Sequence, residues 1–138
     1  MSSSSYISVL NTSNTVFNGF DTTVFSQGSI TFSSNSTATV PVTGTYTICF
    51  EMQFDSVSTG TGTFDSMWLV KNSTNPPTYG MQLQQVCVGS QMYLSSSATM
   101  RLTANDTIQV YVYQNSGTTL HVGSLGSGTA RLEITKNF

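Results

Sequence analysis

The clearest pattern in the chain is a strict alternation of apolar and polar residues that begins after Gly44. The apolar positions are Tyr46, Ile48, Phe50, Met52 and Phe54. A period of two places these side chains on one face of an extended backbone, which is typical of a strand with one side in an apolar core. Pro41 and Gly44 favour a turn just before it. The pattern therefore predicts a long strand from just after Gly44 to near Asp55.

Shorter segments of the same kind recur along the chain and are separated by turn-forming residues. They lie at residues 6–10, 17–25, 29–32, 37–40, 64–71, 79–88, 92–94, 98–103, 107–113, 120–122 and 129–135. No convincing amphipathic helix interrupts them. About eight to ten short strands with regular turns predict an all-β sandwich or jelly roll. We expect residues 1–5 to form a flexible, serine-rich tail and residues 6–138 to form one domain.

The composition excludes several classes of partner. Only 7% of the residues are charged and the formal net charge is −2, so the polar surface consists mainly of hydroxyl and amide groups. The four basic residues are scattered, which argues against nucleic-acid binding. No apolar run is long enough to enter a membrane. The first residues lack the basic and apolar regions of a signal peptide, so we expect none in this chain.

The residues that could carry chemistry do not form a catalytic pattern. His121 is the only histidine, and it stands in a strand-like Leu-His-Val context without a Ser-His-Asp order or a second metal ligand. The acidic residues do not form a calcium-binding loop, and we expect Asp106 to be a turn residue whose side chain bonds nearby backbone amides. Cys49 falls on the polar face of its strand, and Cys87 shares a face with Met81 and Leu83. The sequence does not decide whether they are bonded, but two free thiols are favoured. We therefore expect neither an enzyme nor a cofactor or metal site.

Four short motifs occur in a fixed order over nearly the whole chain. They are Pro41, Gly44, Tyr46 and Ile48; Leu69-Val70-Lys71-Asn72; residues 100–108, with Met100, Leu102, Asn105, Asp106 and Ile108; and residues 128–132, from Gly128 to Leu132. Together they resemble the C1q/tumour-necrosis-factor-like domain family. Asn105 replaces the family's glycine, which is acceptable because Asn tolerates a positive φ. The aromatic residue that usually precedes the last glycine is missing, which resembles the microbial or viral members.

The resemblance implies a ten-strand jelly-roll β-sandwich that assembles as a compact homotrimer. It also implies a non-enzymatic role, in which the domain binds a receptor, a glycan or a neighbouring coat protein. We expect a structural or adhesive head at a particle surface, such as a virion, phage fibre or spore coat, or an extracellular position. One alternative is a carbohydrate-binding module, with Tyr79 and Tyr93 as glycan contacts. The other is a secreted, cytokine-like receptor ligand.

The alternation also predicts an interface of the trimer. If Met67 and Leu69 point into the core, their neighbours on the same strand point outward, and the same holds for the strand at residues 107–113. The outward residues are Trp68, Val70, Gln109, Tyr111 and Tyr113. Aromatic side chains are enriched and charges depleted in protein interfaces, so we expect these five residues to line the threefold contact. The alternative is that segments of the same chain cover some of them.

Overall fold

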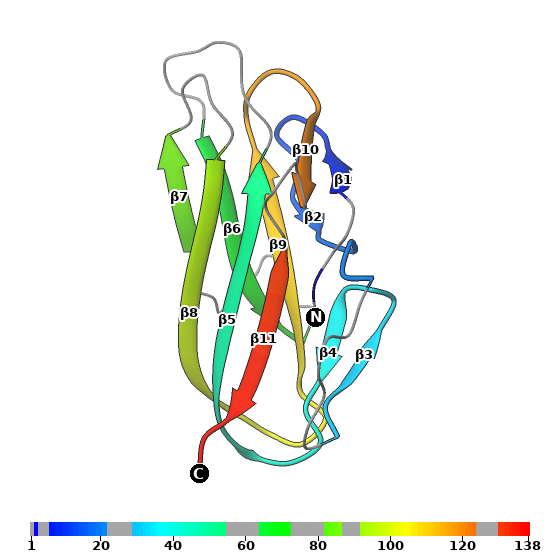
Figure 1. The fold of residues 1–138 in the computed structure, drawn as a ribbon, viewed down its shortest axis with the longest axis vertical. Coiled ribbons are helices and arrows are strands. Elements are labelled where there is room, and N and C mark those ends of the chain that lie inside the picture. The colour runs from blue at the N-terminus through cyan, green and yellow to red at the C-terminus, as the bar shows by residue number, and fades with distance from the viewer. Residues whose placement is uncertain are drawn as a thin grey trace.

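The computed structural model describes residues 2, 6–21, 29–54, 64–72, 82–86, 92–123 and 130–138, and for residues 64, 65 and 82–86 it describes only the backbone. These residues form two antiparallel β-sheets that lie one behind the other, with the strands roughly along the long axis of the molecule (Figure 1). In the described residues no helix is long and apolar enough to cross a lipid bilayer.

The sheet nearer the viewer in Figure 1, here called the front sheet, is built around one long strand, β5. Its strands are β1 (Tyr6–Val9), β5 (Gly44–Phe54), β8 (Met92–Leu102), β10 (Leu120–Gly123) and β11 (Arg131–Lys136). β8 pairs with β5 over its whole length. On the other side of β5, β11 and β10 follow one another, and β1 pairs with β10 at the far edge (Figure 1).

The second sheet, here called the back sheet, is built around β9 in the same way. Its strands are β2 (Thr15–Val16), β3 (Thr31–Ser33), β4 (Thr37–Thr39), β6 (Phe64–Lys71), β7 (Gln82–Val86) and β9 (Thr107–Gln114). β6 lies on one side of β9, and β4 and β2 lie on the other. The described part of the chain thus has ten strands of three residues or more, together with the two-residue β2. The predicted ten-strand jelly-roll sandwich is confirmed.

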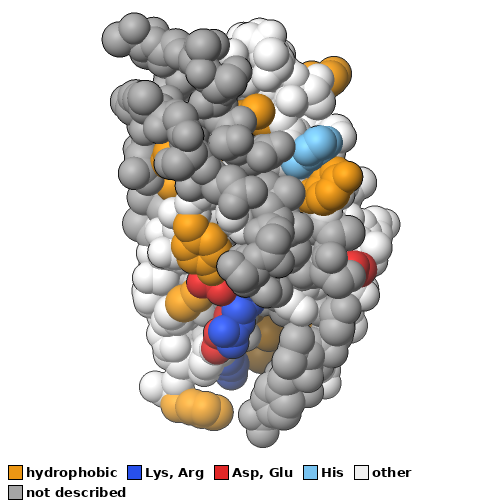
Figure 2. Space-filling model, turned by 45° about the horizontal axis from the view of Figure 1, so that its top comes forward, with side chains coloured by type: hydrophobic (Ala, Val, Ile, Leu, Met, Phe, Trp, Pro, Cys, Tyr) orange, Lys and Arg blue, Asp and Glu red, His pale blue; other side chains and the backbone are white. Residues whose placement is uncertain are grey.

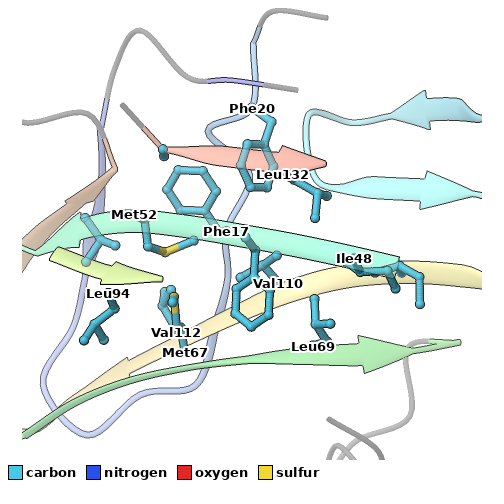
Figure 3. Close-up of a cluster of buried hydrophobic side chains, with 14 of the residues drawn as sticks. Phe17, Phe20, Ile48, Met52, Met67, Leu69, Leu94, Val110, Val112 and Leu132 are labelled. Carbon is cyan, nitrogen blue, oxygen red and sulfur yellow. The ribbon is translucent and has the colours of Figure 1, made fainter. Parts of the chain in front are cut away.

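The core lies between the two sheets and is lined by the predicted alternating residues. In β5 the side chains of Tyr46, Ile48, Phe50, Met52 and Phe54 are each at most 1% exposed. They face Met67 and Leu69 of β6 and the inward residues of β9 (Figure 3). Burying one side chain of this size stabilises the fold by about 1.5–3 kcal/mol. The Tyr46 hydroxyl donates a hydrogen bond of 2.7 Å to the carbonyl of Val42, so its polar end is satisfied.

Two expectations about local structure need correction. The segments at 92–94 and 98–103 are a single strand, β8, because pairing with β5 continues through Ser95, Ser96 and Ser97. The predicted strand at 17–25 is not seen in its described part, where Phe17 and Phe20 are buried core residues and the pairing strand β2 comes earlier. Ser2, within the predicted tail, forms an isolated bridge with Arg131.

Candidate functional site

The outer face of the front sheet is open to solvent. Along β5, β8 and β11 every second side chain points away from the core, and these side chains are exposed or half-buried. They include Thr45, Thr47, Cys49, Glu51, Tyr93, Ser95, Ser97, Thr99, Arg131 and Glu133. Figure 2 shows that most of the acidic and basic side chains visible from this side form one small group. In a chain with so few charges, this group marks the face as a candidate site.

A groove of about 390 Å³ crosses this face over β8, β5 and β11. Its walls include Cys49, Glu51, Ser97, Arg131 and Glu133. Arg131 lies opposite Glu51 in the strand register, and its Nη2 is 3.1 Å from Oε2 of Glu133. One guanidinium therefore neighbours two carboxylates, and the groove carries a formal net charge of −1. Since both ion-pair partners are more than half exposed, their attraction adds little to the stability of the fold.

Tyr93 lies at the end of this face and is 49% exposed. Partial burial of the phenol raises its pKa, and the hydrogen bond and negative charge of Glu51 raise it further, to about 12, against a smaller opposite effect of Arg131. The phenol therefore stays protonated at physiological pH, and its O–H donates to Glu51 while its oxygen can still accept and its ring is partly exposed. This combination is typical of a contact residue in a binding surface.

Two further candidate groups, Cys49 and His121, lie on strands of the front sheet. Cys49 is a free, exposed cysteine, as predicted, whereas Cys87 lies outside the described residues. His121 stands on β10, and its ring centroid lies 4.3 Å from that of Tyr6 at a tilt of 49°. Among the described residues, no group of three or more His, Cys, Asp or Glu side chains is arranged to hold a metal ion.

The five residues of the predicted interface come together on the outer face of the back sheet. Trp68 pairs with Tyr111 and Val70 with Gln109 across β6 and β9. However, Trp68 is 8% exposed and Val70 is fully buried, whereas Gln109, Tyr111 and Tyr113 are half-buried. The alternative, that the same chain covers part of this face, therefore holds for Trp68 and Val70. Of the two predicted glycan contacts, Tyr93 lies on the front sheet, and Tyr79 lies outside the described residues.

Asp106 has a larger structural role than the turn residue that the sequence predicts. As expected, its Oδ2 accepts a hydrogen bond of 2.7 Å from the backbone N–H of Thr103. It also lies 2.6 Å from Nζ of Lys71, and its Oδ1 accepts a bond of 2.8 Å from Nδ2 of Asn72. Burial raises the pKa of Asp106, but the hydrogen bonds from Lys71, Asn72 and Thr103 and the charge of Lys71 outweigh this effect and lower it to about 2.

Comparison with known proteins identifies the architecture. No protein-family model and no curated protein matches the sequence. Among solved structures, the chain is similar to Eiger TNF from S. frugiperda, with 13% identity and a TM-score of 0.62 over 98% of this chain and 87% of that one.

Two further structures share the same arrangement. The globular domain of zebrafish complement 1qA protein is 13% identical, with a TM-score of 0.57 over 97% of this chain and 98% of that one. Murine APRIL is 13% identical, with a TM-score of 0.54 over 92% of this chain and 98% of that one. The microbial or viral type stays a prediction. The two sheets, their strand order and these likenesses show that the chain has the jelly-roll fold of tumour necrosis factor and C1q globular domains.

Proposed function

We propose that this chain is a non-enzymatic binding domain that acts as a homotrimer at the surface of a particle or cell. The observation that carries the proposal is the open outer face of the front sheet together with the edge of β8 beside it, which pairs with no other strand in the described part of the chain. A closed ring of three copies needs two different surface patches that fit one another, because each copy uses one patch on each neighbour. These two surfaces meet that requirement.

The edge of β8 is the first patch. β8 is 11 residues long, pairs with β5 on one side, and has no strand paired with its other side among the described residues. From Tyr93 to Met100 the strand contains no charged residue, proline or glycine. Natural proteins often place charged residues or proline on free strand edges, which prevents unwanted pairing with other chains. An edge without them is best explained by a partner that covers it in the assembled protein.

The outer face of β5, β8 and β11 is the second patch. It is rich in hydroxyl groups, such as the Thr47–Thr99 pair whose Oγ1 atoms lie 3.1 Å apart, and it carries the exposed ring of Tyr93. An exposed aromatic ring on a face rich in hydroxyl groups suits a protein interface, where aromatic residues are enriched. Because β8 borders both patches, the edge of one copy can rest on the face of the next. We therefore place the threefold contact here rather than on the predicted Trp68 surface.

The test is the mass of the protein in solution, measured by light scattering coupled to size-exclusion chromatography. We expect three times the chain mass of 14.8 kDa. A monomeric mass at micromolar concentrations would contradict the proposed assembly.

For the biological setting we propose a structural or adhesive head on a virus particle, phage fibre or spore coat. The low charge and the surface rich in hydroxyl groups support this, because such a surface changes little with pH or salt. Fractionation of purified particles tests the proposal, and recovery of the protein only outside them would count against it.

A further inference from the structure

The outer face of the back sheet lies outside the proposed threefold contact and is only partly covered by the chain itself. Here the only tryptophan of the chain, Trp68 on β6, pairs with Tyr111 on β9, and Ser66 pairs with Tyr113 in the same register. All four side chains point away from the core. We refer to Trp68, Tyr111 and Tyr113 as the aromatic platform.

Two rings of the platform, those of Trp68 and Tyr111, stack on one another. The centroids of Trp68 and Tyr111 lie 6.3 Å apart, and their planes differ by 24°, so the two rings are nearly parallel. Tyr111 and Tyr113 are half-buried and therefore keep part of their surface open to solvent. The exposed part of such an aromatic ring can stack against the C–H face of a ring-shaped ligand.

Two buried polar atoms of this surface have no hydrogen-bond partner. These are Nε1 of Trp68 and Oγ of Ser66, and their residues are 8% and 0% exposed. Leaving such a group unpaired costs about 1–3 kcal/mol, and native proteins rarely leave two of them together. The indole N–H can only donate, whereas the serine hydroxyl can donate or accept. A ligand with oxygen atoms would satisfy both.

We propose that the aromatic platform binds a neutral saccharide. A sugar ring offers an apolar face to Tyr111 and Tyr113, and its hydroxyl groups can bond to Trp68 Nε1 and Ser66 Oγ. The bordering groups are also neutral, since Nε2 of Gln109 donates a bond of 2.9 Å to Oγ1 of Thr37. The described outward residues of β4, β6 and β9 include no charged side chain, which disfavours anionic and cationic ligands.

Access to the buried atoms requires a local movement. Nε1 of Trp68 is closed off from solvent, and the ring stacked on the indole is the half-buried Tyr111. The saccharide therefore binds as Tyr111 moves away from the indole N–H, with the sugar ring against Tyr111 and a sugar hydroxyl group reaching Nε1. This inference extends the proposed binding role to a ligand class, and it does not depend on threefold assembly.

The single tryptophan makes the site directly measurable. The full chain is titrated with glucose-, galactose- and N-acetylglucosamine-terminated oligosaccharides while Trp68 emission is recorded, and we expect a saturable change with at least one of them. Binding to the variants is followed by calorimetry. Trp68→Phe keeps a ring but removes the donor, and we expect about tenfold weaker binding. Ser66→Ala should weaken binding by a similar factor.

Tyr111→Ala should abolish measurable binding, because it removes the stacking surface. Tyr6→Ala is the matched control, since Tyr6 is an exposed aromatic residue on the other sheet and its loss should change nothing. Circular dichroism checks that each variant is folded. If Trp68→Phe does not fold, the affinity of Tyr111→Ala tests the proposed saccharide binding. Absence of binding to all three sugar classes overturns the inference, as does full affinity in Tyr111→Ala. Light scattering on the same samples tests the trimer separately, so either proposal can fail alone.

Discussion

The ammonium group of Lys71 lies 2.6 Å from Oδ2 of Asp106 and ties the end of β6 to the turn between β8 and β9. Asn72, the residue directly after β6, adds hydrogen bonds to this contact. Its Nδ2 donates to Asp106, and its Oδ1 accepts from the backbone N–H of Thr107 at 2.8 Å. Since β8 belongs to the front sheet and β6 and β9 to the back sheet, this network joins the two layers at one end of the sandwich.

Acid should weaken this end of the molecule. The pKa of Asp106 falls from 3.8 to about 2 on folding. A carboxyl with a lowered pKa stabilises the folded state above its unfolded pKa and loses that contribution as the pH falls through the folded value. We expect a contribution of about 2 kcal/mol that is complete above about pH 5 and disappears between about pH 4 and pH 2. Denaturant unfolding at a series of pH values measures it.

The variant Asp106→Asn isolates this effect. It keeps the size of the side chain but removes its charge, so we expect it to lower the unfolding free energy by about 2–3 kcal/mol at pH 7. Near pH 2 it should match the wild type within error. The control is Glu133→Gln, which removes an exposed carboxylate and should cost less than about 0.5 kcal/mol. Equal pH dependence in the wild type and in Asp106→Asn would show that another group is responsible.

Asn105 should accept glycine but not alanine. Its φ is 72°, in the left-handed region, and its backbone N–H donates a bond of 2.8 Å to the carbonyl of Val40. A residue with a Cβ and no local polar group pays about 1–2 kcal/mol in that region, whereas glycine does not. Thermal unfolding of Asn105→Ala and Asn105→Gly compares the two. Equal loss in both variants would mean that the asparagine side chain matters more than the backbone.

The buried Gln114 should be among the most sensitive polar residues of the fold. Its Nε2 donates to the carbonyls of Val9 and Thr118 at 3.0 and 2.7 Å, and its Oε1 accepts from the N–H of Ser116 at 2.7 Å. Gln114→Leu leaves these three backbone groups without their partner, so we expect a loss of about 3 kcal/mol in unfolding free energy. Gln109→Leu, at a half-buried position, is the control and should cost about 1 kcal/mol or less.

The parts of the fold that the sequence predicts well are those in which each strand carries its own signal. Apolar and polar residues alternate strictly along β5 and β9, and the apolar residues are buried as expected. The same alternation extends past Val112 and would have placed Gln114 inward. β8 is different, because its serines at 95–97 carry no apolar period. Its continuity comes from pairing with β5, a partner distant in the sequence.

In the candidate site, too, the local features can be predicted from the sequence, whereas the contacts between distant residues cannot. The outward direction of Trp68 and Tyr111 and the turn bond from Thr103 to Asp106 are local properties, and the sequence predicts both. The partners Lys71 and Asn72 lie more than thirty residues from Asp106, so no local pattern reveals them. The groove on the front sheet depends on which strands flank β5. That order follows from the packing of the whole chain and not from any one segment.

The position of the threefold contact can be tested with a single charge on the front sheet. Ser97 is exposed, lies opposite Cys49 in the register and borders the groove. Ser97→Arg should fold as well as the wild type, because the side chain already faces solvent in the isolated chain. In the trimer it would bury three bulky guanidinium groups, and removing each of them from water costs several kcal/mol even beside the carboxylates of the groove. We therefore expect a folded monomer by light scattering and circular dichroism.

The matched control is Thr31→Arg, which places the same charge at an exposed position on the outer face of the back sheet and should leave the trimer intact. Tyr93→Ala should weaken the trimer without a new charge, because it removes the aromatic ring from the proposed contact. Dissociation of Thr31→Arg together with an intact Ser97→Arg trimer would move the interface to the back sheet. That result would restore the surface of Trp68, Val70, Gln109, Tyr111 and Tyr113 as the threefold contact, and it would make the aromatic platform unavailable to a saccharide in the assembled protein.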